Sequence, residues 1–306
     1  YAAEANLVPS FTVYDDDDAA TLVMKAVPSL RRQQAELAAH KISLAKDYCL
    51  TPDDDLSAVD STGELSAIYR AYEQRLSETG NADFGDLIIK PVRVMEENLA
   101  VREQMRFRFR VIMVDEYQDS NVAQFKLLQT LSGTDEGSGT YVCVVGDDDQ
   151  SIYRFRGAEV QNILTFRKKF PGTKIIKLVR NYRSTGKILA AADAVVKNNE
   201  DRIGKTLKAE RGTGKDPVLV YLPDQDAEAK FCAALIEKAH AEKKTPYGDW
   251  AILYRTNAQS LGFENEFLHR RIPYTVVGSL KFYEREEIKD TLAFLSLAAN
   301  ERDEIA

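Results

Sequence analysis

Cysteine and histidine are scarce in this chain of 306 residues. The three cysteines are Cys49, Cys143 and Cys232, and the three histidines are His40, His240 and His269. Neither set has the spacing of a zinc site, and three widely separated cysteines do not make a disulfide framework. The scarcity therefore excludes a structural zinc fold and a disulfide scaffold, and it favours a reducing, cytoplasmic compartment.

Long apolar runs and an excess of positive charge are also absent. No apolar stretch approaches the about 18 residues that a membrane span needs, so we expect no membrane partner. The formal net charge of −7 excludes a uniformly basic nucleic-acid coat but leaves a local basic groove open. What is present is an ordinary globular composition, 44% hydrophobic, long enough for two domains or three small ones.

Three regions follow one another along the chain. Residues 1–107 show helical patterns and no strand alternation, and the Asp15–Asp18 run predicts a solvated helix start. Residues 108–178 alternate strand and helix patterns, which predicts a parallel sheet, and residues 179–306 form a second α/β unit. Strands are expected at 111–114, 141–145, 174–178, 218–222, 250–254 and 274–277, and later helices at 184–198, 225–243 and 258–270. Because the chain starts at Tyr1 and stops after a helical pattern, we interpret it as an internal piece of a longer protein.

The most informative segment is an apolar run that ends in two carboxylates. Val111–Val114 is typical of a strand buried on both faces of a parallel sheet. Asp115 and Glu116 follow it, at the strand end where open α/β sheets bind ligands. Asp115 is suited to hold Mg²⁺, directly or through its water shell, and Glu116 to orient or deprotonate a water.

A second strand repeats this pattern about 30 residues later. Tyr141–Val145 leads into Gly146, three aspartates and Gln150. An amide at Gln150 is placed to touch a terminal phosphate or an attacking water. Two such strand ends together indicate a nucleotide-hydrolysing motor, whereas one alone would be weak evidence.

Aromatic and guanidinium groups alternate directly after Gln150. Tyr153 and Phe155 are suited to stack on bases, and Arg154 and Arg156 to meet phosphates. The alternative is a turn that packs its aromatic rings in a core. Further on, Tyr182 and Arg183 lie at the start of a predicted helix, where they suit an adenine and a γ-phosphate. The alternative there is a capped helix start with a surface arginine.

These segments resemble the motifs of superfamily 1 helicases of the UvrD/PcrA/Rep type. The resemblance covers nearly the whole chain in order. It rests on 115–119 (DEYQD), 145–158 (VGDDDQSIYRFRGA) and 181–185 (NYRST), and it extends to 83–88, 253–260, 272–278 and 281–290. The implied fold is α/β: a helical subdomain (1–107), part of a first RecA-like domain (108–178) and part of a second (179–306).

The resemblance implies an ATP-driven motor that moves 3′→5′ on single-stranded DNA and unwinds duplex junctions, with ATP and Mg²⁺ as cofactors. Asp115 would hold Mg²⁺, Glu116 would activate water, and Gln150 would couple the γ-phosphate to the DNA site. Arg156 would lie near the phosphate, and Tyr182 and Arg183 would contact adenine and γ-phosphate. Tyr153, Arg154 and Phe155 would face DNA, with weaker stacking at Phe155, where the family usually has Trp.

The chain has no complete GxxxxGK[ST] loop to hold the phosphates. Gly204-Lys205-Thr206 has the right ending, but Asn199 stands at the first glycine position. Gly212–Lys215 is followed by Asp216, and Ala209 replaces the first glycine. We therefore expect the isolated chain to be inactive. We also expect its incomplete first sheet either to pair edge to edge with another copy or to be poorly ordered.

Two alternative functions stay open at this stage. One is the helicase subunit of a helicase–nuclease complex. The other is a non-catalytic module that binds DNA or a partner after loss of motor activity. The presence of Asp115, Glu116, Gln150, Arg156 and Arg183 argues against such decay.

Overall fold

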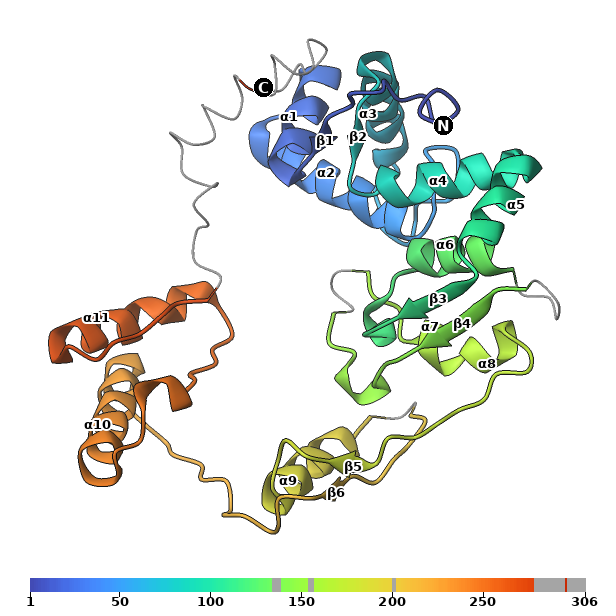
Figure 1. Cartoon of the computed structure of the whole chain (residues 1–306). Helices are drawn as coiled ribbons and strands as arrows, with labels where there is room; N and C mark the ends of the chain where they lie inside the picture. The colour runs from blue at the N-terminus through green and yellow to red at the C-terminus, as the bar shows by residue number, and fades with distance from the viewer. Residues whose placement is uncertain (134–138, 154–156, 200–201, 278–294, 296–306) are drawn as a thin grey trace. The chain divides into compact units, whose positions relative to one another are not determined.

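The computed structural model describes residues 1–133, 139–153, 157–199, 202–277 and 295. The chain divides into two compact units, one of residues 1–214 with 291–306, the other of residues 215–290. Figure 1 shows the helices and strands of each unit. Each unit is described by itself.

The first unit begins with a helical region. Its helices are α1 (Asp16–Ala26), α2 (Arg32–Asp47), α3 (Leu65–Thr79), α4 (Asp86–Glu97) and α5 (Leu99–Arg108). The predicted start of α1 is confirmed, because Asp15 caps the helix by accepting from the backbone N–H groups of Asp17 and Asp18. The expectation of no strands here is wrong in detail. Two-residue strands, β1 (Val13–Tyr14) and β2 (Ala82–Asp83), pair in parallel.

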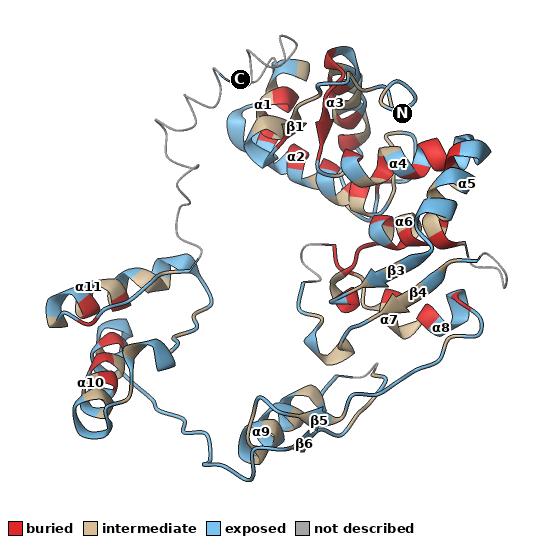
Figure 2. Cartoon of the chain, viewed as in Figure 1, coloured by how far each residue is buried: buried red, intermediate tan, exposed pale blue. Residues whose placement is uncertain are grey.

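The core of this region lies between α1, α2 and α3. Helix α2 has small residues on its inner face, which lets α1 and α3 approach it closely. The buried members include Ala35, Ala38, Ala39, Ile42 and Ala45 on α2, Leu22 and Val23 on α1, and Tyr69, Tyr72 and Leu76 on α3. Burying each large side chain contributes about 1.5–3 kcal/mol, so this cluster stabilises the helical region. Figure 2 shows this concentration of buried residues in α1–α4.

A two-stranded parallel sheet follows. Strands β3 (Val111–Val114) and β4 (Tyr141–Val144) pair in register, Val111 opposite Tyr141 and Val114 opposite Val144. The other elements are α6 (Val122–Ser132), α7 (Gln161–Leu164), α8 (Phe166–Lys169) and the 3₁₀ turns η1 (Tyr117–Asp119) and η2 (Asp148–Gln150). Phe125, Phe166 and Phe170 pack with Tyr117 against one face of the pair.

The other face of this sheet contradicts the expectation of a strand buried on both sides. Val111 is 61% exposed and Met113 is 71% exposed, while Ile112 and Val114 are half-buried. Within the described part of the chain, only one face of β3 is therefore packed. Parallel pairing itself, the basis of the sheet prediction, is confirmed.

The remainder of the first unit is thinly packed. It contains β5 (Arg180–Asn181), α9 (Gly186–Val196) and β6 (Lys208–Ala209). Helix α9 has no buried residue, and it is tan and pale blue throughout in Figure 2. Residues 174–178, predicted as a strand, have no regular structure. A strand is stable only beside a neighbour, and β5 and β6 pair over two residues only.

The second unit packs two helices against each other. Helix α10 (Gln225–Lys243) matches its predicted bounds, and α11 (Ser260–Arg270) follows the 3₁₀ turns η4 (Tyr247–Asp249) and η5 (Asn257–Gln259). Ala229, Ala233, Phe263 and Phe267 form the centre of the core. The strands predicted at 218–222, 250–254 and 274–277 are wrong, since these residues form no strand. Among the helices described here, none is both long and apolar enough to cross a membrane.

Candidate active site

Two backbone hydrogen bonds bring the predicted strand ends together. The Val145 N–H donates to the Val114 carbonyl (2.8 Å), and the Tyr117 N–H donates to the Val145 carbonyl (2.9 Å). These bonds continue the parallel ladder one step beyond β3 and β4. The pair Asp115–Glu116 therefore lies beside the turn that starts at Gly146.

The two carboxylates of the first strand end are exposed and held by local bonds. Asp115 Oδ1 accepts from the Glu116 N–H at 2.9 Å. Glu116 has a φ of +48°, in the left-handed region that residues with a Cβ rarely adopt. Such a conformation costs on the order of 1 kcal/mol, and it turns the chain sharply from strand β3 into η1. Asp115 and Glu116 are thereby both left accessible at the sheet edge.

Gln118 joins the two strand ends through its side chain. This residue is only 1% exposed. Its Nε2 donates to Glu116 Oε2 at 2.8 Å, and its Oε1 accepts from the Asp147 N–H at 3.0 Å. A Cβ at Gly146 would lie 2.7 Å from Gln118 Oε1, so a larger residue there would force the Gln118 amide to shift. The sequence analysis named no role for Gln118; the available signal was an amide beside the Asp115–Glu116 pair and a glycine ending the second strand.

The second strand end forms an acidic turn, Asp147–Asp149, with Gln150. Gln150 Nε2 donates to Asp147 Oδ2 at 2.7 Å, so the predicted coupling residue is held by the turn itself. Burial alone would raise the pKa of Asp147. Hydrogen bonds from Lys205 and Gln150 outweigh it and hold the pKa of this carboxyl below its usual value.

The candidate metal-binding carboxylates differ in whether they already form ion pairs with basic side chains. The carboxylates of the acidic turn lie close enough together to share an ion, but Arg202 pairs with Asp149, and Lys205 with Asp147. Asp115 has no ion pair among the described residues. With an exposed carboxylate at a strand end, it fits Mg²⁺ better than the acidic turn does.

A hollow of about 430 Å³ lies next to Asp115 and Glu116. Strand β3 and helix α6 form its apolar wall. The lining residues include Ile112, Val114, Leu127, Leu128 and Leu131. The carboxylates therefore stand at the rim of an open, largely apolar hollow.

The remaining predicted residues are only partly placed. Tyr153 is 40% exposed, and its carbonyl accepts from the Ala158 N–H. Arg154, Phe155 and Arg156 lie outside the described residues. Tyr182 is 66% exposed, with the Arg180 guanidinium 5.7 Å from its ring centre.

Arg183 lies in a turn organised by Asn181. Asn181 Oδ1 accepts from the N–H groups of Arg183 (3.0 Å) and Ser184 (2.7 Å). In the part of the chain that the structure describes, the side chains of Tyr182 and Arg183 make no hydrogen bond or ion pair with Asp115 or Glu116. The structure thus brings Asp115, Glu116 and the Gln150 turn together. Tyr182 and Arg183 form no such bond with Asp115 or Glu116 among the described residues.

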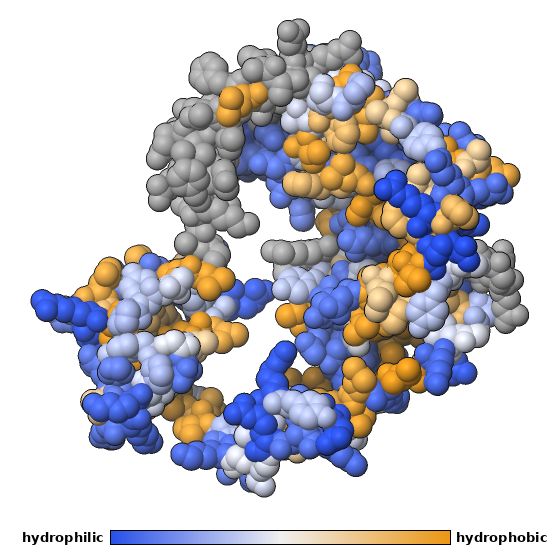
Figure 3. Space-filling view, viewed as in Figure 1, coloured by the Kyte–Doolittle hydropathy of each residue, from blue (hydrophilic) through white to orange (hydrophobic). Residues whose placement is uncertain are grey.

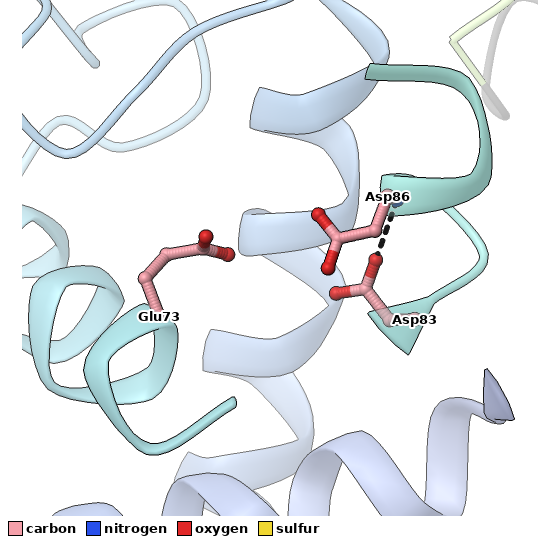
Figure 4. A group of neighbouring side chains, drawn as sticks. All are labelled: Glu73, Asp83 and Asp86. Atoms are coloured by element: carbon pink, nitrogen blue, oxygen red, sulfur yellow. Dashed lines mark hydrogen bonds between the residues drawn. The ribbon is translucent and has the colours of Figure 1, made fainter. Parts of the chain in front are cut away.

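A buried charge cluster lies in the helical region, at the Asp83–Asp86 segment. Glu73, Asp83 and Asp86 converge in Figure 4, and the Lys46 ammonium contacts all three carboxylates at 2.6–2.9 Å. Burial alone would lower the pKa of Lys46, but the carboxylates raise it well above its usual value. Burial raises the pKa of Asp86 to about 6. Because the ammonium fills the centre, this acidic group is an ion-pair network and not a metal site.

The comparisons with known proteins identify the family of the chain. Residues 1–171 match the UvrD/REP helicase N-terminal domain, and residues 176–306 match the UvrD-like helicase C-terminal domain. Over 97% of its length, the chain is 37% identical to ATP-dependent DNA helicase UvrD1 of Mycobacterium tuberculosis. It is 38% identical to DNA helicase II of Rickettsia typhi and 39% identical to ATP-dependent DNA helicase PcrA of Staphylococcus epidermidis.

The chain spans 40%, 46% and 41% of the length of these three relatives, respectively. The two matched domains confirm the predicted α/β, RecA-like fold class. The domain that matches residues 1–171 covers more than half of the chain and contains Asp115, Glu116 and Gln150. This chain therefore belongs to the UvrD/REP helicase family.

Proposed function

We propose that this chain carries the catalytic edge of an ATP-dependent DNA helicase that moves 3′→5′ on single-stranded DNA and unwinds duplex junctions. In this proposal Asp115 holds Mg²⁺ directly or through water, and Glu116 activates the water that attacks the γ-phosphate. The relatives are named as ATP-dependent DNA helicases, which supports the same reaction class.

The observation that carries the proposal is the meeting of two strand ends. Register between β3 and β4 places Asp115–Glu116 next to the Gln150 turn, and Gln118 bonds to both. Water activation needs a carboxylate held in a fixed direction beside the phosphate. Gln150 lies at the end of the neighbouring strand, where its side-chain amide can contact that phosphate and respond to bound DNA.

Further residues are assigned roles in the same proposal. Tyr182 contacts the adenine, and Arg183 and Arg156 neutralise charge that develops on the phosphates. Tyr153, Arg154 and Phe155 face the single strand, where an aromatic ring contributes about 1–3 kcal/mol per stacked base. The exposure of Tyr182 and Tyr153 supports these roles, because a stacking ring must be accessible.

The test is DNA-stimulated ATP hydrolysis by the natural protein that contains this chain. Glu116→Gln keeps the size of the side chain and removes the base, so we expect a rate loss of about 100-fold or more with nucleotide binding retained. Glu103→Gln, on the exposed side of α5, is the matched control. A Glu116→Gln protein with the wild-type rate would contradict the assignment.

The 306-residue chain tested by itself is expected to give no turnover. Neither of its Gly-Lys segments fits a phosphate loop, and Lys205, in the better of the two, pairs with Asp147. Turnover by this chain that disappears in Glu116→Gln would refute the expectation.

We also propose that an open edge of the β3–β4 sheet pairs edge to edge with a second copy of the chain. Val111, Met113 and Tyr141 are each more than 60% exposed on β3 and β4. An open strand edge with apolar neighbours favours association. Light scattering should show a mass that rises with concentration, and Met113→Lys should reduce that rise. A clean monomer at all concentrations would exclude the pairing.

A further inference from the structure

A short basic segment, Arg202–Lys205, contacts every carboxylate of the acidic turn. Arg202 donates to both oxygens of Asp149, at 2.6 and 2.7 Å. The Ile203 N–H donates to Asp148 Oδ2 at 2.8 Å, and Lys205 forms an ion pair with Asp147. Each aspartate thus has one partner in a segment more than fifty residues further along the chain.

These contacts are stronger than ordinary surface pairs. The Arg202 and Asp149 side chains are only 16% and 10% exposed, and those of Lys205 and Asp147 19% and 22%. A two-bond arginine–carboxylate contact fixes both direction and distance. Lys177 also contacts the segment, since its Nζ donates to the Gly204 carbonyl at 2.7 Å. The acidic turn is therefore held in one position by the basic segment.

The acidic turn is linked to the Glu116 carboxylate by hydrogen bonds through one buried side chain, that of Gln118. Lys205 pairs with Asp147, the Asp147 N–H donates to Gln118 Oε1, and Gln118 Nε2 donates to Glu116 Oε2. Asp147 also accepts from Gln150 through Oδ2. A shift of the turn must therefore move both Gln150 and the Asp147 N–H, the donor that orients the Gln118 amide.

We infer that Arg202 and Lys205 are positioning residues for Glu116, acting through the acidic turn and Gln118. When the basic segment is bound, the Gln118 amide is fixed and aims the Glu116 carboxylate. When it is released, the Gln118 amide loses the fixed Asp147 N–H donor, and the Glu116 carboxylate is no longer held in one direction. The position of the basic segment thus determines the orientation of the Glu116 carboxylate. Only the catalytic meaning of Glu116 rests on the proposed function.

The structural test is NMR of the uniformly ¹⁵N-labelled chain, without nucleotide. The double variant Arg202→Ala/Lys205→Ala should shift and broaden the Gln118 side-chain amide signals and the Asp147 backbone amide. Arg202→Lys/Lys205→Arg keeps both charges and should restore most of the wild-type positions. Lys174→Ala, at an exposed lysine, is the matched control and should move neither signal.

Two outcomes of this test separate a relay from a local contact. Unmoved Gln118 signals in a folded double variant would overturn the inference. If the double variant does not fold, the single variant Lys205→Ala replaces it, because Lys205 is the ion-pair partner of Asp147. That variant should disturb the Gln118 amide and leave the Arg202–Asp149 contact intact. A Gln118 amide unchanged in Lys205→Ala would equally overturn the inference.

The functional arm uses the natural protein that contains the chain. Lys205→Ala should lower the kcat of DNA-stimulated ATP hydrolysis about 10-fold with KM for ATP unchanged, since aim and not binding is lost. Lys205→Arg should recover most of the rate. An unchanged kcat in Lys205→Ala would overturn the positioning role, whereas a wild-type rate in Glu116→Gln would overturn the proposed function and leave the NMR result standing.

Discussion

The helical region (α1–α5) differs from a thinly packed segment, residues 172–222, in how completely its side chains fill a core. This segment consists of the end of the first unit and the start of the second. In the helical region, Leu22, Tyr69 and Tyr72 are at most 1% exposed. In the thinly packed segment, α9 has no buried residue, and Val218, Leu219 and Tyr221 are 77–87% exposed. Apolar surface in this segment is visible in Figure 3. Similar apolar content therefore gives a packed core in one region and open surface in the other.

The difference shows what local sequence can and cannot specify. A helix satisfies its backbone within itself, and an apolar stripe then needs only a neighbouring helix close in sequence. A strand satisfies its backbone through another strand, which can lie far away in the chain. The strand-like residues 174–178 and 218–222 find no such neighbour among the described residues. The strands β3 and β4, by contrast, do pair with each other, and the candidate site at their ends is therefore formed.

The largest predicted effect removes the buried cation of the helical region. Lys46→Met leaves the buried Asp83 and Asp86 and the half-buried Glu73 without their common partner, which should cost about 3–5 kcal/mol. Urea unfolding followed by far-UV circular dichroism measures the loss. Arg70→Ala, which breaks an exposed pair with Asp53, is the control and should cost less than about 1 kcal/mol. Equal losses of unfolding free energy in the two variants would mean that the Lys46 ion-pair cluster does not stabilise this region.

A second prediction compares matched truncations in the two regions. Leu22→Ala in α1 should lower the free energy of unfolding by about 2–5 kcal/mol, because it opens a cavity in a full core. Ile188→Ala in α9 should cost less than about 1 kcal/mol, because this side chain is already 49% exposed. The same urea series measures both. A larger loss at Ile188 than at Leu22 would reverse the comparison.

The smallest predicted effect depends on pH. Burial and the nearby Asp83 raise the pKa of Asp47 to about 6. The folded state then binds more protons than the unfolded state between pH 4 and 6, so this group's contribution to stability falls as pH rises through that window. Asp47→Asn should therefore stabilise the chain at pH 8 by on the order of 1 kcal/mol, after discounting for solvent screening.

The measurement is thermal unfolding of both proteins at pH 4 and pH 8. The gain from Asp47→Asn should disappear at pH 4, where the wild-type carboxyl is largely protonated in the folded state. Glu103→Gln on α5 should change little at either pH. A gain of equal size at both pH values would show that charge at Asp47 is not its cause.

The sequence predicts those features that depend on neighbours in the chain. The Asp15 cap, the bounds of α10 and the ends of β3 and β4 follow from local patterns. The Gln118 bridge is not predictable in the same way, because its partner Asp147 comes from the second strand end. The three strands predicted in the second unit are wrong because an apolar run shows a preference for strand but does not show which second strand it would pair with.

The central claim is that the catalytic edge is already assembled, although the segment after it is not packed. Hydrogen exchange of the 306-residue chain, without ligand, tests this most directly. The account predicts slow exchange at the amides of Tyr117 and Val145, which bond across the two strand ends, and fast exchange at 218–222. Exchange at Tyr117 and Val145 as fast as at 218–222 would contradict it.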